Sequence, residues 1–117
     1  TDGSQASNKP EDSNTGPNVT GTLSRDAIRK VIKKNRKKYK YCYEKHLQKD
    51  PELSGLIKVK FTISPTGAVI AAMATKDTVG NEAFTGCVLG VAKKMEFPEP
   101  KGGGIVVVNY PFNFSSN

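Results

Sequence analysis

Residues 55–64, with the sequence GLIKVKFTIS, limit the folds open to this chain more than any other segment. Apolar and polar side chains alternate along it, with Ile57, Val59, Phe61 and Ile63 on one side and Lys58, Lys60 and Thr62 on the other. Such alternation is typical of a β-strand that has one face in the core and the other in water. Helices that cover this strand must therefore all pack on the same face of its sheet.

The segments on either side supply the rest of an α+β domain. Residues 64–67 (SPTG) predict a turn, and the following apolar run, AVIAAMAT, predicts the returning strand of a hairpin. Apolar residues spaced three and four apart predict one helix from the N-cap Ser24 to about residue 49, and a second over residues 80–95. Residues 105–114 predict a last strand. The order helix, strand, strand, helix, strand predicts an α+β fold with two helices on one face of a three-stranded antiparallel sheet.

The first 21 residues have a different composition from the rest. They consist mainly of Ser, Asn, Thr, Gly, Pro and Asp, and their clearly apolar side chains are Ala6 and Val19. Such a segment buries too little apolar surface to offset the entropy lost on ordering. We expect residues 1–21 to be a flexible polar linker and residues 22–117 to be one folded domain.

Positive charge is concentrated in the first predicted helix. The chain carries 18 Lys and Arg against 11 Asp and Glu, and eleven of the basic residues lie between Arg25 and Lys49. They fill the face of this helix opposite its apolar stripe, including Lys33, Arg36, Lys37 and Lys40. A solvated helix face is the simpler interpretation. The alternative is a site for an anionic partner, namely nucleic acid, a lipid head group or a cell-wall polymer.

No residue pattern in the sequence indicates an enzyme. His46 is the single histidine, and no nucleophile or second ligand is placed to work with it. The KGGG sequence at residues 101–104 lacks the GK[ST] continuation and the helix of a phosphate-binding loop. Two cysteines and one histidine make a poor zinc set. The sequence therefore predicts a protein without catalytic residues, cofactor or metal.

The two cysteines lie on the apolar stripes of the two predicted helices. On the second helix this stripe comprises Ala83, Cys87, Val88, Val91 and Met95, and Gly86 and Gly90 beside it would permit close approach to a neighbouring element. Because both helices cover the same sheet face, Cys42 and Cys87 are either two buried thiols or a disulfide that ties the helices together. A disulfide would indicate an oxidising compartment.

Pro111 in the last strand predicts the order of the sheet. Proline has no N–H, so it is tolerated in a strand where that position faces an open edge. Backbone groups on one side of an antiparallel strand belong to alternate residues. The residues whose backbone groups face the open edge would then be Ile105, Val107, Asn109 and Pro111. The even-numbered residues would pair inward with the first strand, so the predicted order is second, first, third.

Several segments resemble a known family. They are Tyr41-Cys42-Tyr43-Glu44, the strand region LSGLIKVKFTISPTGAV (53–69), the helix start GNEAFTGCV (80–88) and the ending FPEPKGGGIVVVNYPFNF (97–114). Together they resemble the C-terminal domain of AgmX/PglI-type proteins of gliding bacteria, a branch of the TonB C-terminal domains. Met95 departs from the pattern, because the family often has Trp at this position.

The resemblance implies a non-enzymatic periplasmic domain with a TonB C-terminal-like fold and a Cys42–Cys87 disulfide. It implies a tether to the inner membrane through an anchor outside this chain, and a proton-driven motor of the ExbB/ExbD or TolQ/TolR type. The implied partners are outer-membrane or periplasmic proteins of a motility or transport complex, often bound by pairing of an extended peptide with the last strand. The outward residues Ile105, Val107, Asn109 and Pro111, predicted above, would form this binding edge. The alternative is a basic binding module for nucleic acid or cell-wall polymer.

Overall fold

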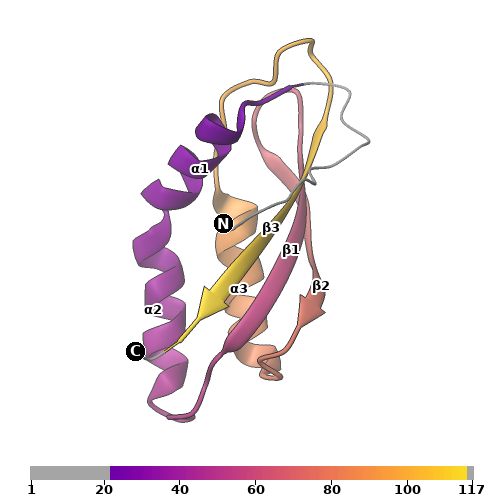
Figure 1. Ribbon diagram of the computed structural model, residues 1–117. Coiled ribbons are helices and arrows are strands. Elements are labelled where there is room, and N and C mark those ends of the chain that lie inside the picture. Colours follow the sequence, from indigo (N-terminus) through magenta and orange to yellow (C-terminus); the bar gives the residue numbers. More distant parts are fainter. Residues whose placement is uncertain (1–21, 116–117) are drawn as a thin grey trace.

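The computed structural model describes residues 22–115, so the predicted linker, residues 1–21, lies outside the described residues. The elements are α1 (Arg25–Lys34), α2 (Arg36–Leu47), β1 (Gly55–Ile63), β2 (Val69–Asp77), α3 (Glu82–Lys94) and β3 (Val106–Phe114). The strands form one antiparallel sheet in the order β2-β1-β3, and the helices lie together on one side of it (Figure 1). The predicted α+β class and strand order are confirmed.

The first predicted helix is divided into α1 and α2 at Asn35. The backbone of Asn35 has φ −99° and ψ 6°, outside the helical range. Its side-chain Nδ2 donates to the carbonyl oxygen of Val31 at 2.8 Å, and its backbone N–H bonds to Val31 and Ile32. An Asn side chain that competes for backbone partners weakens a helix where it stands. These bonds give partners to the side-chain Nδ2 and the backbone N–H of Asn35, which is buried.

The central strand β1 pairs with its two neighbours differently. Its register with β3 runs unshifted from Gly55 opposite Phe114 to Ile63 opposite Val106. Its register with β2 shifts twice, once between Lys58 and Val59 and again before Ile63. Each shift leaves one additional residue on β2, as in a β-bulge. The regular side of the sheet is therefore the β3 side.

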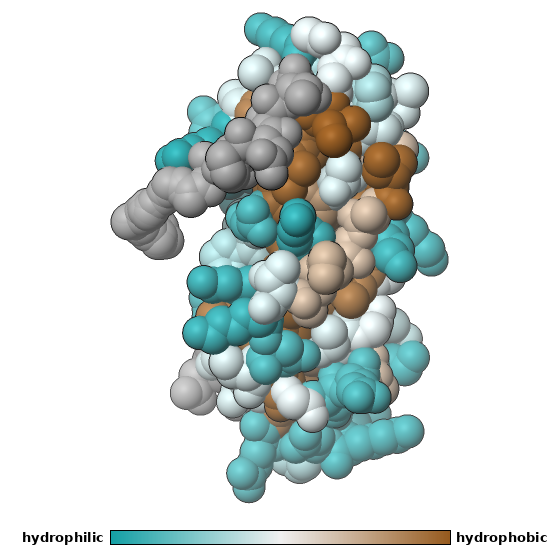
Figure 2. Space-filling model, turned by 90° about the vertical axis from the view of Figure 1, so that its right-hand side faces the viewer, coloured by the Kyte–Doolittle hydropathy of each residue, from teal (hydrophilic) through white to brown (hydrophobic). Residues whose placement is uncertain are grey.

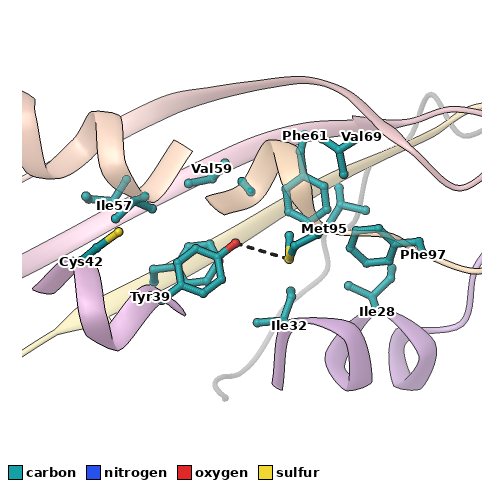
Figure 3. Close-up of a cluster of buried hydrophobic side chains, with 14 of the residues drawn as sticks. Ile28, Ile32, Tyr39, Cys42, Ile57, Val59, Phe61, Val69, Met95 and Phe97 are labelled. Atoms are coloured by element: carbon teal, nitrogen blue, oxygen red, sulfur yellow. Dashed lines mark hydrogen bonds between the residues drawn. The ribbon is translucent and has the colours of Figure 1, made fainter. Parts of the chain in front are cut away.

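The core lies between the helices and the inner face of the sheet. Ile57, Val59, Phe61 and Ile63 of β1 are completely buried, as the alternating pattern predicts. Figure 3 shows residues of α1 and α2 meeting residues that follow α3 in this core, where the Tyr39 hydroxyl donates to Met95 Sδ at 3.4 Å. Burial, with a smaller contribution from Tyr110, raises the pKa of Tyr39, so this hydroxyl keeps its proton. Met95 thus fills a core position and accepts a hydrogen bond there.

The buried stripe of α3 agrees with the predicted one in part. Val88 and Met95 are buried and Cys87 and Val91 are partly buried, as predicted. The stripe also includes Phe84 and Ala92, whereas Ala83 is exposed. The helix is rotated because the large Phe84 ring occupies the interior and Ala83 has little surface to bury. A Cβ added at Gly86 or Gly90 would meet nothing within 4 Å, so the expected close approach at these glycines is wrong.

Asp77 organises the connection from β2 to α3. Its carboxylate accepts from the backbone N–H groups of Val79 at 2.8 Å and Gly80 at 3.2 Å, and from Thr85 Oγ1 at 2.5 Å. Partial desolvation acts to raise the pKa of Asp77, but the bonds from Thr85, Gly80 and Val79 together lower it. The ionised carboxylate is therefore favoured in the folded state.

We expect Asp77→Asn to lower the free energy of unfolding by about 1 kcal/mol at pH 7, because the charged acceptor is lost. A lowered folded-state pKa means that the unfolded chain binds more protons, so this stability is present above the ordinary value of 3.8 and is lost as the pH falls below it. Urea unfolding at pH 7 and pH 3 should show the difference between variant and parent closing in acid. Glu99→Gln, in an exposed loop, is the control, and a difference that persists unchanged at pH 3 would contradict the role of the charge.

Candidate functional site

The outer edge of β3 is open along the described chain. Within residues 22–115, β3 has β1 as its neighbour on one side and no strand on the other. The Thr78 N–H donates to the Leu56 carbonyl at 2.8 Å, so the backbone of Leu56 points toward β2. By alternation the backbone of Ile57 points toward β3, where it lies opposite Phe112. Phe112 therefore pairs inward, and the backbone of Pro111 points outward.

The same alternation extends along the strand because the register is unshifted. The outward backbone groups belong to Val107, Asn109, Pro111 and Asn113. Asn109, Pro111 and Asn113 are also exposed, and Ile105 lies one residue before β3 begins. Pro111 can accept a hydrogen bond at this edge but cannot donate one. An approaching strand would therefore find donors at Val107, Asn109 and Asn113.

A groove of about 870 Å³ is lined by the C-terminal half of β3 on one side and by α1 and α2 on the other. Aromatic rings from both sides form its floor, namely Tyr39, Tyr43, Tyr110, Phe112 and Phe114. The ring centroids of Tyr39 and Phe112 are 4.6 Å apart, and those of Tyr43 and Phe114 are 5.7 Å apart. A step of four residues along α2 thus matches a step of two along β3. The helix and the strand run side by side in the same direction, as Figure 1 also shows.

The helical wall of the groove is basic. Its basic members are Arg29, Lys30, Lys33, Arg36 and Lys40, and its acidic member is Asp26. Asp26 is paired with Arg29 at 2.6 Å, which leaves the other four basic side chains to set the charge of the wall. Lys33, Arg36 and Lys40 are exposed to solvent. The groove therefore combines a positive wall, an aromatic floor and the outward backbone of a strand.

The structure brings some of the predicted site residues together and separates others. Lys33, Arg36 and Lys40 line the same groove as Pro111, although the sequence places them far apart. Lys37 lies in a different hollow, between α2 and α3, with Tyr41 and both cysteines. Val107 and Asn109 continue the strand edge beyond the groove lining.

Cys42 and Cys87 form a disulfide in the structure, with their Cα atoms 5.9 Å apart. Cys42 is almost completely buried, at 1% exposure, and Cys87 is partly buried. The bond joins α2 to α3. Because α2 carries part of the basic wall, the disulfide fixes this wall relative to the layer of helices on the sheet.

His46 is held in place by contacts within the domain. Its Nδ1 donates to the carbonyl oxygen of Cys42 at 2.9 Å, one turn earlier in α2. Its ring meets the edge of Phe84, with the centroids 5.8 Å apart. These contacts orient the imidazole at the end of α2.

Sequence reasoning missed the exposed apolar side chains of β2. Ile70 and Met73 are 62% and 56% exposed. Figure 2 views the molecule from the right-hand side of Figure 1, where hydrophobic side chains gather in the upper half and hydrophilic ones in the lower half. The signal was present in the sequence IAAM, whose members cannot all face the core of a strand with period two.

Across residues 22–115, no three His, Cys, Asp or Glu side chains stand close enough together to hold a metal ion. The helices of this part of the chain are also too short or too polar to cross a membrane.

These features define an α+β domain with an accessible strand edge beside a basic groove. No protein-family model and no characterised protein matches the sequence. Among solved structures, the chain is similar to the C-terminal domain of TonB from Helicobacter pylori, residues 179–285, determined by NMR in solution. The alignment covers 82% of this chain and 96% of that one, with 18% sequence identity and a TM-score of 0.42. The assignment of function therefore rests on the residues of the site.

Proposed function

We propose that this chain is a non-enzymatic, TonB-like periplasmic domain that binds an extended segment of an outer-membrane protein along the edge of β3. The outward backbone of Val107, Asn109 and Asn113 is the observation that carries the proposal. An exposed strand edge binds a peptide through main-chain hydrogen bonds, and adjacent pockets select its side chains. The groove beside β3 supplies such a pocket.

Two further observations support the periplasmic assignment. The disulfide between Cys42 and Cys87 would persist in an oxidising compartment, and thiols are kept reduced in the cytosol. The sequence segments 53–69 and 97–114 resemble AgmX/PglI-type domains of gliding bacteria. On this basis we propose a role in a trans-envelope motility or energy-transducing complex, with a proton-driven motor of the ExbB/ExbD or TolQ/TolR type and an inner-membrane anchor outside this chain.

Nucleic-acid binding is the second candidate, because the groove wall is basic. Proteins that bind single strands stack bases on exposed aromatic faces. In this groove Tyr39, Tyr43 and Phe112 are 4%, 8% and 8% exposed, and their faces are used in contacts with one another and with Phe114. The positive wall remains, but Tyr110 and Phe114 are the rings of this floor that are only partly buried, so the area for stacking is small. The geometry therefore favours a peptide over a nucleic acid.

Photo-crosslinking in cells tests the proposed function. A photo-reactive amino acid in place of Asn109 in the full-length protein should give a protein adduct that sediments with outer membranes. The same group in place of Lys76 of β2, at the opposite side of the sheet, is the matched control and should give none. The reason for the contrast is that the proposed partner lies along β3.

Two outcomes would count against this function. Adducts that are sensitive to nuclease would favour the nucleic-acid module. Equal adducts from positions 109 and 76 would show that the edge of β3 does not select the partner.

A further inference from the structure

We infer that the extended segment which pairs with β3 is acidic at alternate positions, and that its carboxylates contact Lys33, Arg36 and Lys40. This inference rests on the proposed strand addition and specifies the chemistry of the partner. The partner is thus an acidic, extended peptide rather than an apolar one or a helix.

The first step is the direction of the partner's side chains. Residues that lie opposite each other in neighbouring strands place their side chains on the same face of the sheet. In β3, Val108 and Phe112 are buried toward the helices, whereas Asn109 and Pro111 are exposed on the other face. Partner residues opposite Tyr110, Phe112 and Phe114 would therefore point into the groove. Those between them would point away from the helices.

The second step is the charge that these side chains meet. The groove wall has five basic residues and one acidic residue, and the acidic one, Asp26, is bound to Arg29. Lys40 has a long contact with Glu44, 4.0 Å between Nζ and Oε2, and both side chains are largely exposed. Such a contact is weak and easily exchanged for another carboxylate. The groove therefore lacks negative charge that the partner could supply.

The third step is the repeat distance. One helical step of four residues rises about 6 Å, and two residues of a strand span about 6.7 Å. The two repeats are aligned here, because Tyr39 contacts Phe112 and Tyr43 contacts Phe114. Arg36 and Lys40 are four residues apart on this helix. Arg36 and Lys40 are thus spaced to meet two alternate residues of an added strand, as an alternating acidic sequence would supply. Lys33 lies on α1, before the break at Asn35, and extends the basic wall toward the N-terminal side.

The fourth step concerns the floor of the groove. Tyr39, Tyr43 and Phe112 are buried by their neighbours, so the floor exposes little of their apolar surface to a large apolar anchor. Tyr110 and Phe114 are partly buried and can cover the methylene groups of a Glu side chain. Main-chain bonds would hold the partner, and charge at the wall would select it.

Binding of synthetic peptides to the full chain tests this inference. The probe is an octapeptide with alternating Glu and Thr, blocked at both ends, and the comparison peptide has Gln in place of every Glu. We expect the Glu peptide to bind about tenfold more tightly, and the difference to shrink as salt is added. Amide exchange followed by NMR should slow at Val107 and Asn109. The inward-pointing N–H groups of Val108 and Tyr110 should already exchange more slowly and change less.

A charge-reversal variant tests whether the basic wall of the groove determines which peptide binds. The combined change of Lys33→Glu, Arg36→Glu and Lys40→Glu should reverse the preference, so that an alternating Lys and Thr peptide binds more tightly than the Glu peptide. The matched control changes Lys37→Glu, Lys38→Glu and Lys94→Glu, which line the other hollow, and should keep the preference for Glu. Circular dichroism would confirm that both variants are folded.

Each contrary result has a separate meaning. Equal binding of the Glu and Gln peptides would overturn the acidic partner while crosslinking at position 109 could still support strand addition. Slow exchange at Val107 and Asn109 without peptide, together with elution as a dimer, would show that a second copy of the chain occupies the edge and would overturn the inference.

Discussion

Replacing Phe84 with alanine is expected to lower the free energy of unfolding by about 3–5 kcal/mol, the range for removing a fully buried aromatic ring. Phe84 has no exposed surface. Its ring meets Phe114 edge-on at a centroid distance of 4.7 Å and Tyr43 at 5.9 Å. It therefore joins α3 to both β3 and α2. Its removal would leave a cavity beside Tyr43 and Phe114, two rings of the groove floor.

Thermal and urea unfolding would measure this effect. For a domain of this size, such a loss corresponds to a decrease in melting temperature of more than about 10 °C. Leu89→Ala on the same helix is the matched control. Because Leu89 is only partly buried, its replacement should lower the free energy of unfolding clearly less. A Phe84→Ala variant as stable as the control would show that α3 is not held by this ring.

The sequence was sufficient to predict the sheet and its order. The alternation in β1 specifies one solvent-exposed face and one buried face. In the structure Ile57 is buried and Lys58 is exposed accordingly. Pro111 carried information about distant pairing, because a missing N–H excludes one side of the strand from the sheet. Both signals lie within short segments, one as alternating side-chain polarity and the other as a missing backbone N–H, and a single sequence can therefore report them.

The rotation of α3 and the break at Asn35 were not predicted. Small residues such as Ala83 and Gly86 give α3 no sharply defined apolar stripe, so two neighbouring stripes fit the same spacing. The volume of Phe84 and the space above β1 select one of them, and that space exists only in the assembled fold. At Asn35, the helical spacing continues through the break. The competing side-chain bond to Val31 cannot be read from spacing.

The groove itself is a product of tertiary structure. The basic helix and the β3 edge were predicted as separate features, and the structure places Lys33, Arg36 and Lys40 beside Pro111. Their proximity depends on the path of α2 along β3, which the Tyr39–Phe112 and Tyr43–Phe114 contacts determine. The exposed charge of this helix face thereby becomes one wall of the groove. The position of α2 beside β3 is therefore what the proposed function requires of this fold.

The disulfide bears directly on that requirement, and removing it is expected to lower the free energy of unfolding by roughly 4 kcal/mol in the chain-entropy model. The estimate follows from the separation of 45 residues between Cys42 and Cys87, since closing a long loop restricts the unfolded chain. The double variant Cys42→Ala, Cys87→Ala, compared with the parent in urea, would measure this loss. Because the restriction acts on the unfolded state, the slope of the urea transition should also increase as the unfolded chain becomes less compact.

Reduction of the parent protein provides the control. Reductant should bring the parent close to the stability of the double variant, and it should leave the double variant unchanged, because that variant has no bond to break. Thiol titration of the unfolded, unreduced parent should detect no free thiol. If two thiols are found, or if reduction leaves the urea midpoint unchanged, the bond does not stabilise the domain, and packing of Tyr39 and Tyr43 alone must hold α2 beside β3.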